Sequence, residues 1–299
     1  MSTDIHGSIV AIVTPMLDDG SLDLPALDRL LEWHVESGTH AVVVAGTTGE
    51  SSTLSTQEHC DLVEHCVKSI AGRIPVIAGT GSNNTQEALY LTESAWQHGA
   101  DAALLVAPYY NRPSQRGMYE HFKLLAESVD IPQILYNVPG RTACDLELDT
   151  VDKLAELDNV IAIKDATGDL QRGEQLIERC TDRLAVYSGE DAITFPLMMA
   201  GAKGTISVTA NTAPALMAQM CDLALAGDGD QAKLIDDKLM MLHNNLFLEG
   251  NPVPVKWALA RMGLIGSGIR LPLVELDGKY QLQVSEALTA AGISLAASS

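Results

Sequence analysis

Eight short apolar runs, rich in β-branched residues, recur along this 299-residue chain and constrain its fold more than any other feature. They predict strands at residues 9–13, 41–45, 76–78, 102–106, 134–136, 160–163, 184–187 and 205–208. Successive runs begin roughly 20 to 35 residues apart, the length of one strand and one crossover helix. Eight such units predict an α/β fold, a (β/α)8 TIM barrel. A doubly wound open sheet is the alternative, because βα alternation alone does not prove closure.

The segments between the runs carry helix signals. Asn84 is predicted to cap a helix whose Glu87 reaches back to the cap as a capping box. Three glycines follow helical patterns, where a left-handed residue ends a helix: Gly38, Gly99 and Gly201.

About ninety residues follow the eighth predicted strand, and they read as further helices at 213–226, 229–248, 254–262 and 284–291. No Ser/Gly linker separates them from the barrel, so they are predicted to pack on it. The sequence therefore predicts a barrel catalytic domain at 1–225 and a C-terminal helical domain at 226–299.

The charge of the chain limits its partners. It carries 19 Lys and Arg against 39 Asp and Glu, a formal net charge of −20. So acidic a surface disfavours nucleic acid and anionic membranes as partners. It also requires local cationic residues wherever an anionic substrate binds.

The sequence favours a cytoplasmic protein. No apolar run approaches the roughly 18 residues of a membrane span, and no basic region precedes the short apolar stretch near the start. The five cysteines include no CxxC pair, which indicates reduced thiols in a reducing compartment.

Lys164 is the sharpest chemical signal. It directly continues the apolar run at 160–163, and the reacting groups of a barrel lie at the carboxyl ends of its strands. A buried ammonium is costly, so a lysine enclosed there is expected as a neutral amine able to attack a carbonyl. The alternative is a lysine that points to solvent or pairs with Asp165.

Two neighbouring strand ends add groups suited to the same chemistry. Tyr136 ends the preceding strand, where a phenol can donate and accept protons, although a core tyrosine is the alternative. Arg141 follows in a Pro-Gly turn and is a natural carboxylate clamp, or else part of a surface ion pair. Thr47 and Thr48 lie in a Gly-rich turn whose hydroxyls and amides can hold a carboxylate.

Other chemistries lack their residues. No His/Cys/Asp cluster with ligand spacing lies at the strand ends, so no metal site is predicted. The last two strand-end loops lack a Gly-rich phosphate cradle, and the turn at 79–81 lacks the third glycine of a dinucleotide fingerprint.

Six motifs in register resemble the dihydrodipicolinate synthase family over essentially the whole chain. They are GTTGES at 46–51, RIPVIAGTGSN at 73–83, PYYNRPSQ at 108–115, YNVPGRT at 136–142, IAIKDATGD at 161–169 and NPVPVKWAL at 251–259. The resemblance implies a TIM barrel that joins pyruvate to L-aspartate 4-semialdehyde in lysine and diaminopimelate biosynthesis. It further implies no cofactor beyond the covalent pyruvate imine, and a homotetramer built as a dimer of dimers.

The resemblance also assigns catalytic roles by motif position. It implies that Lys164 forms the imine and that Tyr136 donates and accepts protons. Thr47 and Tyr110 would complete a relay to solvent, with Tyr110 supplied by a neighbouring subunit.

Substrate contacts carry over in the same way. Thr48 would hold the pyruvate carboxylate, with the backbone of Ile206 and Gly189 lining the same pocket. Arg141 would receive the carboxylate of the semialdehyde.

A regulatory site is implied as well, because some bacterial members are inhibited by L-lysine at a dimer interface. The matching positions are Ser51, Ser52, His59, Asn83, Glu87 and Tyr109. Thr56 stands where lysine-sensitive members often carry histidine, so weak to moderate inhibition is predicted. An ordinary polar dimer interface is the alternative.

Two other functions stay open at this stage. N-acetylneuraminate lyases and keto-deoxy-sugar-acid aldolases share the lysine and the tyrosine but cleave larger substrates. A catalytically silent ligand-binding paralogue would perform neither reaction. The double threonine, Tyr109-Tyr110 and the setting of Arg141 favour the synthase.

Overall fold

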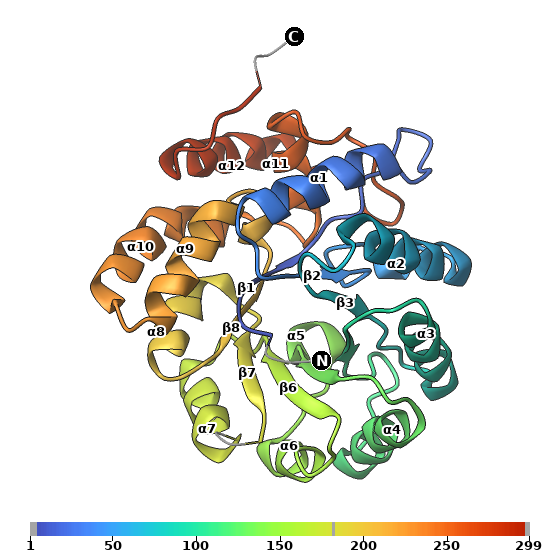
Figure 1. Cartoon of the computed structure of the whole chain (residues 1–299). Helices are drawn as coiled ribbons and strands as arrows, with labels where there is room; N and C mark the ends of the chain where they lie inside the picture. Colours follow the sequence, from blue (N-terminus) through green and yellow to red (C-terminus); the bar gives the residue numbers. More distant parts are fainter. Residues whose placement is uncertain (1–4, 181–182, 297–299) are drawn as a thin grey trace.

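A computed structural model describes residues 5–180 and 183–296, and in it eight parallel strands close into a barrel (Figure 1). The strands are β1 (Gly7–Ala11), β2 (Ala41–Val44), β3 (Val76–Gly79), β4 (Ala102–Val106), β5 (Gln133–Asn137), β6 (Val160–Asp165), β7 (Ala185–Ser188) and β8 (Gly204–Ser207). Each strand pairs with the next in the sequence, and β8 pairs with β1. The closed barrel predicted from the sequence is confirmed, and the open sheet is excluded.

Helices form a ring outside the strands (Figure 1). Those of the barrel are α1 (Leu24–Glu36), α2 (Thr56–Ile70), α3 (Thr85–Gln97), α4 (Gln115–Ser128), α5 (Pro139–Thr142), α6 (Leu148–Leu154), α7 (Leu170–Cys180), α8 (Thr194–Met199) and α9 (Pro214–Leu225). Short 3-10 turns follow three strands: η1 (Ser51–Thr53), η2 (Asp191–Ile193) and η3 (Thr209–Asn211). Because α9 packs against β1, it completes the ring.

Side chains alternate between the inside of the barrel and the layer beneath the helices, as the two-residue period of a strand requires. In β1, Ile9 and Ala11 belong to the apolar cluster within the barrel, whereas Val10 packs beneath the helices. The apolar run continues to Val13, but β1 ends at Ala11. The amide of Val13 donates to Oδ1 of Asn211 at 3.0 Å instead of continuing the ladder.

One predicted helix start is partly wrong. Asn84 does cap α3 and accepts from the amide of Gln86 at 3.0 Å. Glu87 does not reach back to it, because Glu87 accepts a short hydrogen bond from the hydroxyl of Ser82 at 2.5 Å. The capping box of this region is at α2, where Ser55 and Glu58 satisfy each other's amides.

The three helix-ending glycines have the left-handed backbone predicted for them. Their φ values are +81° at Gly38, +86° at Gly99 and +120° at Gly201. A side chain at any of these positions would meet backbone strain.

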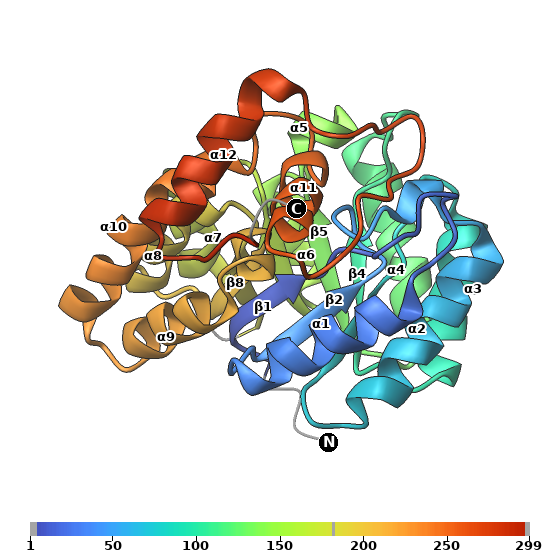
Figure 2. The same ribbon diagram turned by 90° about the horizontal axis from the view of Figure 1, so that it is seen from above.

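Three further helices follow the barrel: α10 (Gly229–Asn245), α11 (Val253–Arg261) and α12 (Gly278–Ala290). Helix α10 packs on α8 and α9, and α12 packs on α10 and α11. Figure 2 shows α11 and α12 at the end of the molecule that also holds α5, the helix directly after β5. The C-terminal helices therefore lie beside the carboxyl ends of the strands. Within the described residues, no helix is long and apolar enough to cross a membrane.

Candidate active site

Lys164 is enclosed within the barrel at the end of β6. It lies between Ala162 and Ala166, which both belong to the inner apolar cluster, and only 6% of the residue is exposed. Its Nζ lies 4.2 Å from the ring centroid of Tyr136, its register partner in β5. The alternative prediction, in which Lys164 points to solvent or pairs with Asp165, is therefore wrong. Lys164 is buried, and Asp165 is bound by Arg172 instead.

Gly189 makes room for this lysine. A Cβ at position 189 would lie 2.9 Å from Cε of Lys164 and 2.6 Å from Cβ of Ala166. Both distances are shorter than carbon atoms tolerate, so only glycine fits beside the lysine in this arrangement.

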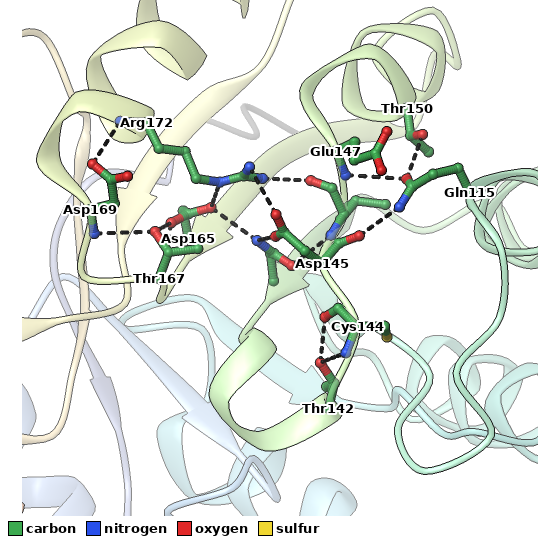
Figure 3. Close-up of polar contacts among 12 residues, drawn as sticks. Gln115, Thr142, Cys144, Asp145, Glu147, Thr150, Asp165, Thr167, Asp169 and Arg172 are labelled. Carbon is green, nitrogen blue, oxygen red and sulfur yellow. Dashed lines mark hydrogen bonds and ion pairs between the residues drawn. The ribbon is translucent and has the colours of Figure 1, made fainter.

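A partly buried polar network holds the ends of β5 and β6 (Figure 3). Arg172 donates from Nε to Asp165 at 2.9 Å and lies 3.3 Å from Asp145. Asn137 donates from Nδ2 to both carboxylates, at 3.2 Å to Asp165 and 2.7 Å to Asp145. Asn137 and Asp165 are register partners, and they directly follow Tyr136 and Lys164. The network therefore fixes the two strand ends next to the tyrosine and the lysine.

The lysine opens into a cavity whose wall is made by strand-end loops. The lining residues are Ala11, Val43, Gly46, Thr47, Thr48, Leu104, Tyr136, Val138, Arg141, Lys164, Gly189, Glu190, Val208, Phe247 and Asn251. Thr48 is 2% exposed, while the guanidinium side chain of Arg141 reaches solvent. Burial and the neighbouring Asp191 raise the pKa of Glu190, which Lys164 and Arg141 partly oppose. The cavity thus offers hydroxyls and a guanidinium for carboxylates, beside a primary amine.

The C-terminal segment holds the loop that carries the two threonines. Lys256 of α11 forms a buried ion pair with Glu50, with side-chain exposures of 5% and 0%. Burial lowers the pKa of Lys256, opposed by the charge of Glu50. Glu50 has a left-handed backbone, with φ of +56°, and ends this turn. The ion pair therefore fixes a turn whose conformation the backbone alone does not favour.

Arg270, a second cation of the C-terminal segment, fixes residues that come after this turn in the chain. Arg270 binds both carboxylate oxygens of Glu58, at 2.6 and 2.9 Å, and donates to the carbonyls of Gly20 and Thr53. The guanidinium lowers the pKa of Glu58 to about 2.

Two predicted members of the site do not line this cavity. Ile206 is 1% exposed and packs in the apolar cluster inside the barrel. Tyr110 is 89% exposed and has a left-handed backbone, with φ of +72°.

The residues predicted for regulation gather around a neighbouring cavity of about 410 Å³. Ser51, Ser52, His59, Glu87 and Tyr109 line it. The sixth, Asn83, lies at its edge and donates to the carbonyl of Tyr109 at 3.1 Å. The two cavities share four lining residues: Thr47, Val138, Arg141 and Asn251.

Three residues of the site were not singled out from the sequence. Asn251 and Lys256 lie in a motif that carried the resemblance without an assigned role, and Arg172 lies in an ordinary helical pattern. A lysine inside the apolar stretch Val255–Leu259 was a usable signal, because buried lysines need a partner. Among residues 5–180 and 183–296, no group of three or more His, Cys, Asp or Glu side chains is placed to hold a metal ion.

Comparisons with known proteins agree with one another. A family model described as "Dihydrodipicolinate synthetase family" matches residues 4–291. The chain is 57% identical to 4-hydroxy-tetrahydrodipicolinate synthase of Thioalkalivibrio sulfidiphilus over 97% of this chain and 99% of the relative. A chloride-inhibited dihydrodipicolinate synthase from Acinetobacter baumannii, solved with pyruvate, superposes with a TM-score of 0.96 at 55% identity, covering 97% and 99% of the two chains. The enzyme of Cyanidioschyzon merolae, solved with lysine bound, gives 0.93 at 36% identity and the same coverages. The chain belongs to the dihydrodipicolinate synthase family.

Proposed function

We propose that this chain is a 4-hydroxy-tetrahydrodipicolinate synthase that condenses pyruvate with L-aspartate 4-semialdehyde through an imine on Lys164. The observation that carries the proposal is the enclosed amine of Lys164, set against the ring of Tyr136 in a cavity walled by Thr48 and Arg141. The relative in Thioalkalivibrio sulfidiphilus bears the name of this activity, and the Acinetobacter baumannii structure is described as a complex with pyruvate.

The reaction follows from the groups in the cavity. The neutral amine of Lys164 attacks the ketone carbon of pyruvate, and the phenol of Tyr136 supplies a proton as water leaves. The resulting protonated imine draws electrons from the methyl group, which loses a proton and becomes an enamine carbon. That carbon attacks the aldehyde, whose oxygen takes up a proton. The amine of the second substrate then adds to the former ketone carbon and expels the lysine, so no cofactor enters the balance.

The two substrate carboxylates have separate partners in this proposal. Thr48 receives the pyruvate carboxylate, with the backbone of Gly189, which lines the cavity, completing that part of the pocket. Arg141 receives the carboxylate of the semialdehyde, a charge-assisted contact that guanidinium geometry suits. In a chain with a net charge of −20, this local cation gives the anionic substrate a favourable place to bind.

The proton relay requires a second copy of the chain. Tyr110 is 89% exposed in the single chain, which suits a side chain that enters the site of a neighbouring subunit and joins Thr47 and Tyr136. The assembly proposed is a homotetramer, a dimer of dimers, working in the cytoplasm.

Borohydride trapping tests the proposal. Incubation with pyruvate and borohydride should add a reduced pyruvyl group to Lys164, located by peptide mass spectrometry. The K164R variant should show none, and K153R, at an exposed lysine, should react as the native chain does. Turnover with aspartate semialdehyde then supports the synthase, whereas pyruvate release from N-acetylneuraminate or another keto-deoxy sugar acid supports a lyase. A folded protein without any adduct would be a silent paralogue.

We further propose feedback inhibition by L-lysine at the second cavity. Glu87 offers a carboxylate to the lysine ammonium, and the walls shared at Thr47 and Arg141 give the bound lysine a path to the active site. The Cyanidioschyzon merolae structure is described with lysine bound. Millimolar lysine should lower turnover of the native chain and act more weakly on E87Q. Unchanged turnover would leave an ordinary polar interface.

A further inference from the structure

Asn251 connects the C-terminal segment to both predicted carboxylate-binding residues. It directly precedes the first residues of α11, is 7% exposed, and lines both cavities. Its side-chain Nδ2 donates to Oγ1 of Thr48 at 2.9 Å. Its backbone carbonyl accepts from the guanidinium of Arg141 at 3.3 Å.

The first of these hydrogen bonds decides how Thr48 can act. A threonine hydroxyl has one proton to donate and two lone pairs to accept with. Because the amide of Asn251 occupies a lone pair, the hydroxyl proton of Thr48 has to point elsewhere. In the described part of the chain, Oγ1 of Thr48 makes no other hydrogen bond. Its proton is therefore available to a group inside the cavity that Lys164 also lines.

The second hydrogen bond acts on the other substrate. Arg141 reaches solvent and has no carboxylate partner among the described residues, and its guanidinium is held by the carbonyl of Asn251. One residue thus anchors both side chains proposed to bind the substrate carboxylates, and donors held in place bind a carboxylate with less further loss of side-chain freedom.

We propose that Asn251 is a positioning residue for substrate binding, which sets Thr48 as a donor toward the pyruvate carboxylate and holds Arg141 toward the second substrate. This inference rests on the proposed synthase function and deepens it. The asparagine itself need not touch the reacting atoms, because its effect passes through the two side chains it orients.

N251D removes the first contact, because aspartate has the same shape but no amide donor; it also adds a negative charge, so N251A, which lacks both the donor and the charge, is measured beside it and in the T48V background. The carboxylate of N251D accepts the hydroxyl proton of Thr48, which reverses the hydrogen bond and removes that proton from the substrate. The backbone carbonyl that holds Arg141 is unchanged. Loss of a hydrogen bond to a charged group predicts a KM for pyruvate raised roughly 10- to 100-fold. The rate at saturating pyruvate should fall much less.

A double-mutant cycle separates positioning from a merely structural role. In the T48V variant no hydroxyl remains to be oriented, so adding N251D should raise the KM for pyruvate less than about 3-fold. N245D is the matched control: the amide of Asn245 donates to the carbonyl of Gln283 at 2.9 Å in the C-terminal helices, outside both cavities. Its KM should match that of the native chain.

Each outcome of these measurements is decisive. A KM for pyruvate unchanged in N251D, or raised equally with and without T48V, overturns the inference. Borohydride trapping of the native chain is run beside the kinetics, so that a missing Lys164 adduct points to failure of the proposed function instead. Should N251D not fold by circular dichroism, N251A removes the donor without adding charge and is expected to raise the KM in the same direction, and an unchanged value there overturns the inference.

Discussion

Replacing Lys256 by methionine removes one half of the buried ion pair that joins α11 to the turn after β2. Methionine has a similar length and no charge, so the variant K256M keeps most of the packing and leaves the buried carboxylate of Glu50 without its ammonium partner, with the backbone amide of Arg270 still donating to it at 3.4 Å. The side chains of Lys256 and Glu50 are 5% and 0% exposed. Water therefore does not replace the lost ammonium.

The size of the effect follows from that burial. Two unit charges at about 4 Å attract by about 4 kcal/mol at an effective dielectric constant near 20. Breaking a buried pair by removing one partner costs about 3–5 kcal/mol, because the remaining charge is left unpaired. K256M should therefore lower the free energy of unfolding by about 3–5 kcal/mol. The double variant E50Q/K256M should recover most of this loss, since no buried charge remains.

The assay is urea unfolding at one fixed protein concentration, because subunit association adds to the stability of an oligomer. K233M is the matched control. Lys233 pairs with Asp237 on the surface of α10, both side chains being 57% exposed, and its loss should cost less than about 1 kcal/mol. If K256M lost no more than K233M, or if E50Q/K256M were no more stable than K256M, the interior pair would not be what holds this turn.

Two other perturbations test the site and the interior. G189A should slow imine formation on Lys164 by roughly a hundredfold, because the new methyl group displaces the amine. The control G278A, with no atom within 4 Å of its new methyl group, should leave the rate unchanged. Rates of borohydride trapping measure both variants. Burial lowers the pKa of His34 to about 3, so the unfolded chain takes up a proton near pH 6.5 that the folded chain refuses. The free energy of unfolding should thus fall as pH drops from about 6.5 toward 3, and His34 alone should lower it by about 2 kcal/mol between pH 7.5 and 5. The H34Q variant should show a weaker pH dependence in urea titrations. An unchanged pH dependence in H34Q would contradict this assignment.

The sequence predicted the elements whose signals are local. All eight strands overlap the apolar β-branched runs, although β1 begins and ends two residues before its run, and β5 and β6 extend into the polar residues Asn137 and Asp165. Strand pairing continues there because the side chains of those two residues find buried partners in the network of Arg172. Lys164 could be identified for a related reason, since a lysine that continues an apolar strand needs a special environment.

Contacts between distant parts of the chain could not be predicted in the same way. Asn251 lies 203 residues from Thr48, and Lys256 lies 206 residues from Glu50, so neither pair leaves a periodic pattern. The capping box at Asn84 failed for a local reason, because the hydroxyl of Ser82, outside the motif, donates to the carboxylate of Glu87. Which donor wins such a competition depends on three-dimensional packing.

These distant contacts connect the C-terminal segment to the residues that line the cavity. A barrel alone supplies inward side chains from its strands, and here it places the lysine and the tyrosine. The turn with the two threonines lies outside the strands, and the arginine lies in the short helix α5 after β5, so the strands do not fix them directly. Asn251 and Lys256 bind these segments from beyond the barrel, and Arg270 binds the residues that follow the threonine turn. In the proposed function, the strands therefore place the groups that react, and the C-terminal segment holds the groups that bind the substrate.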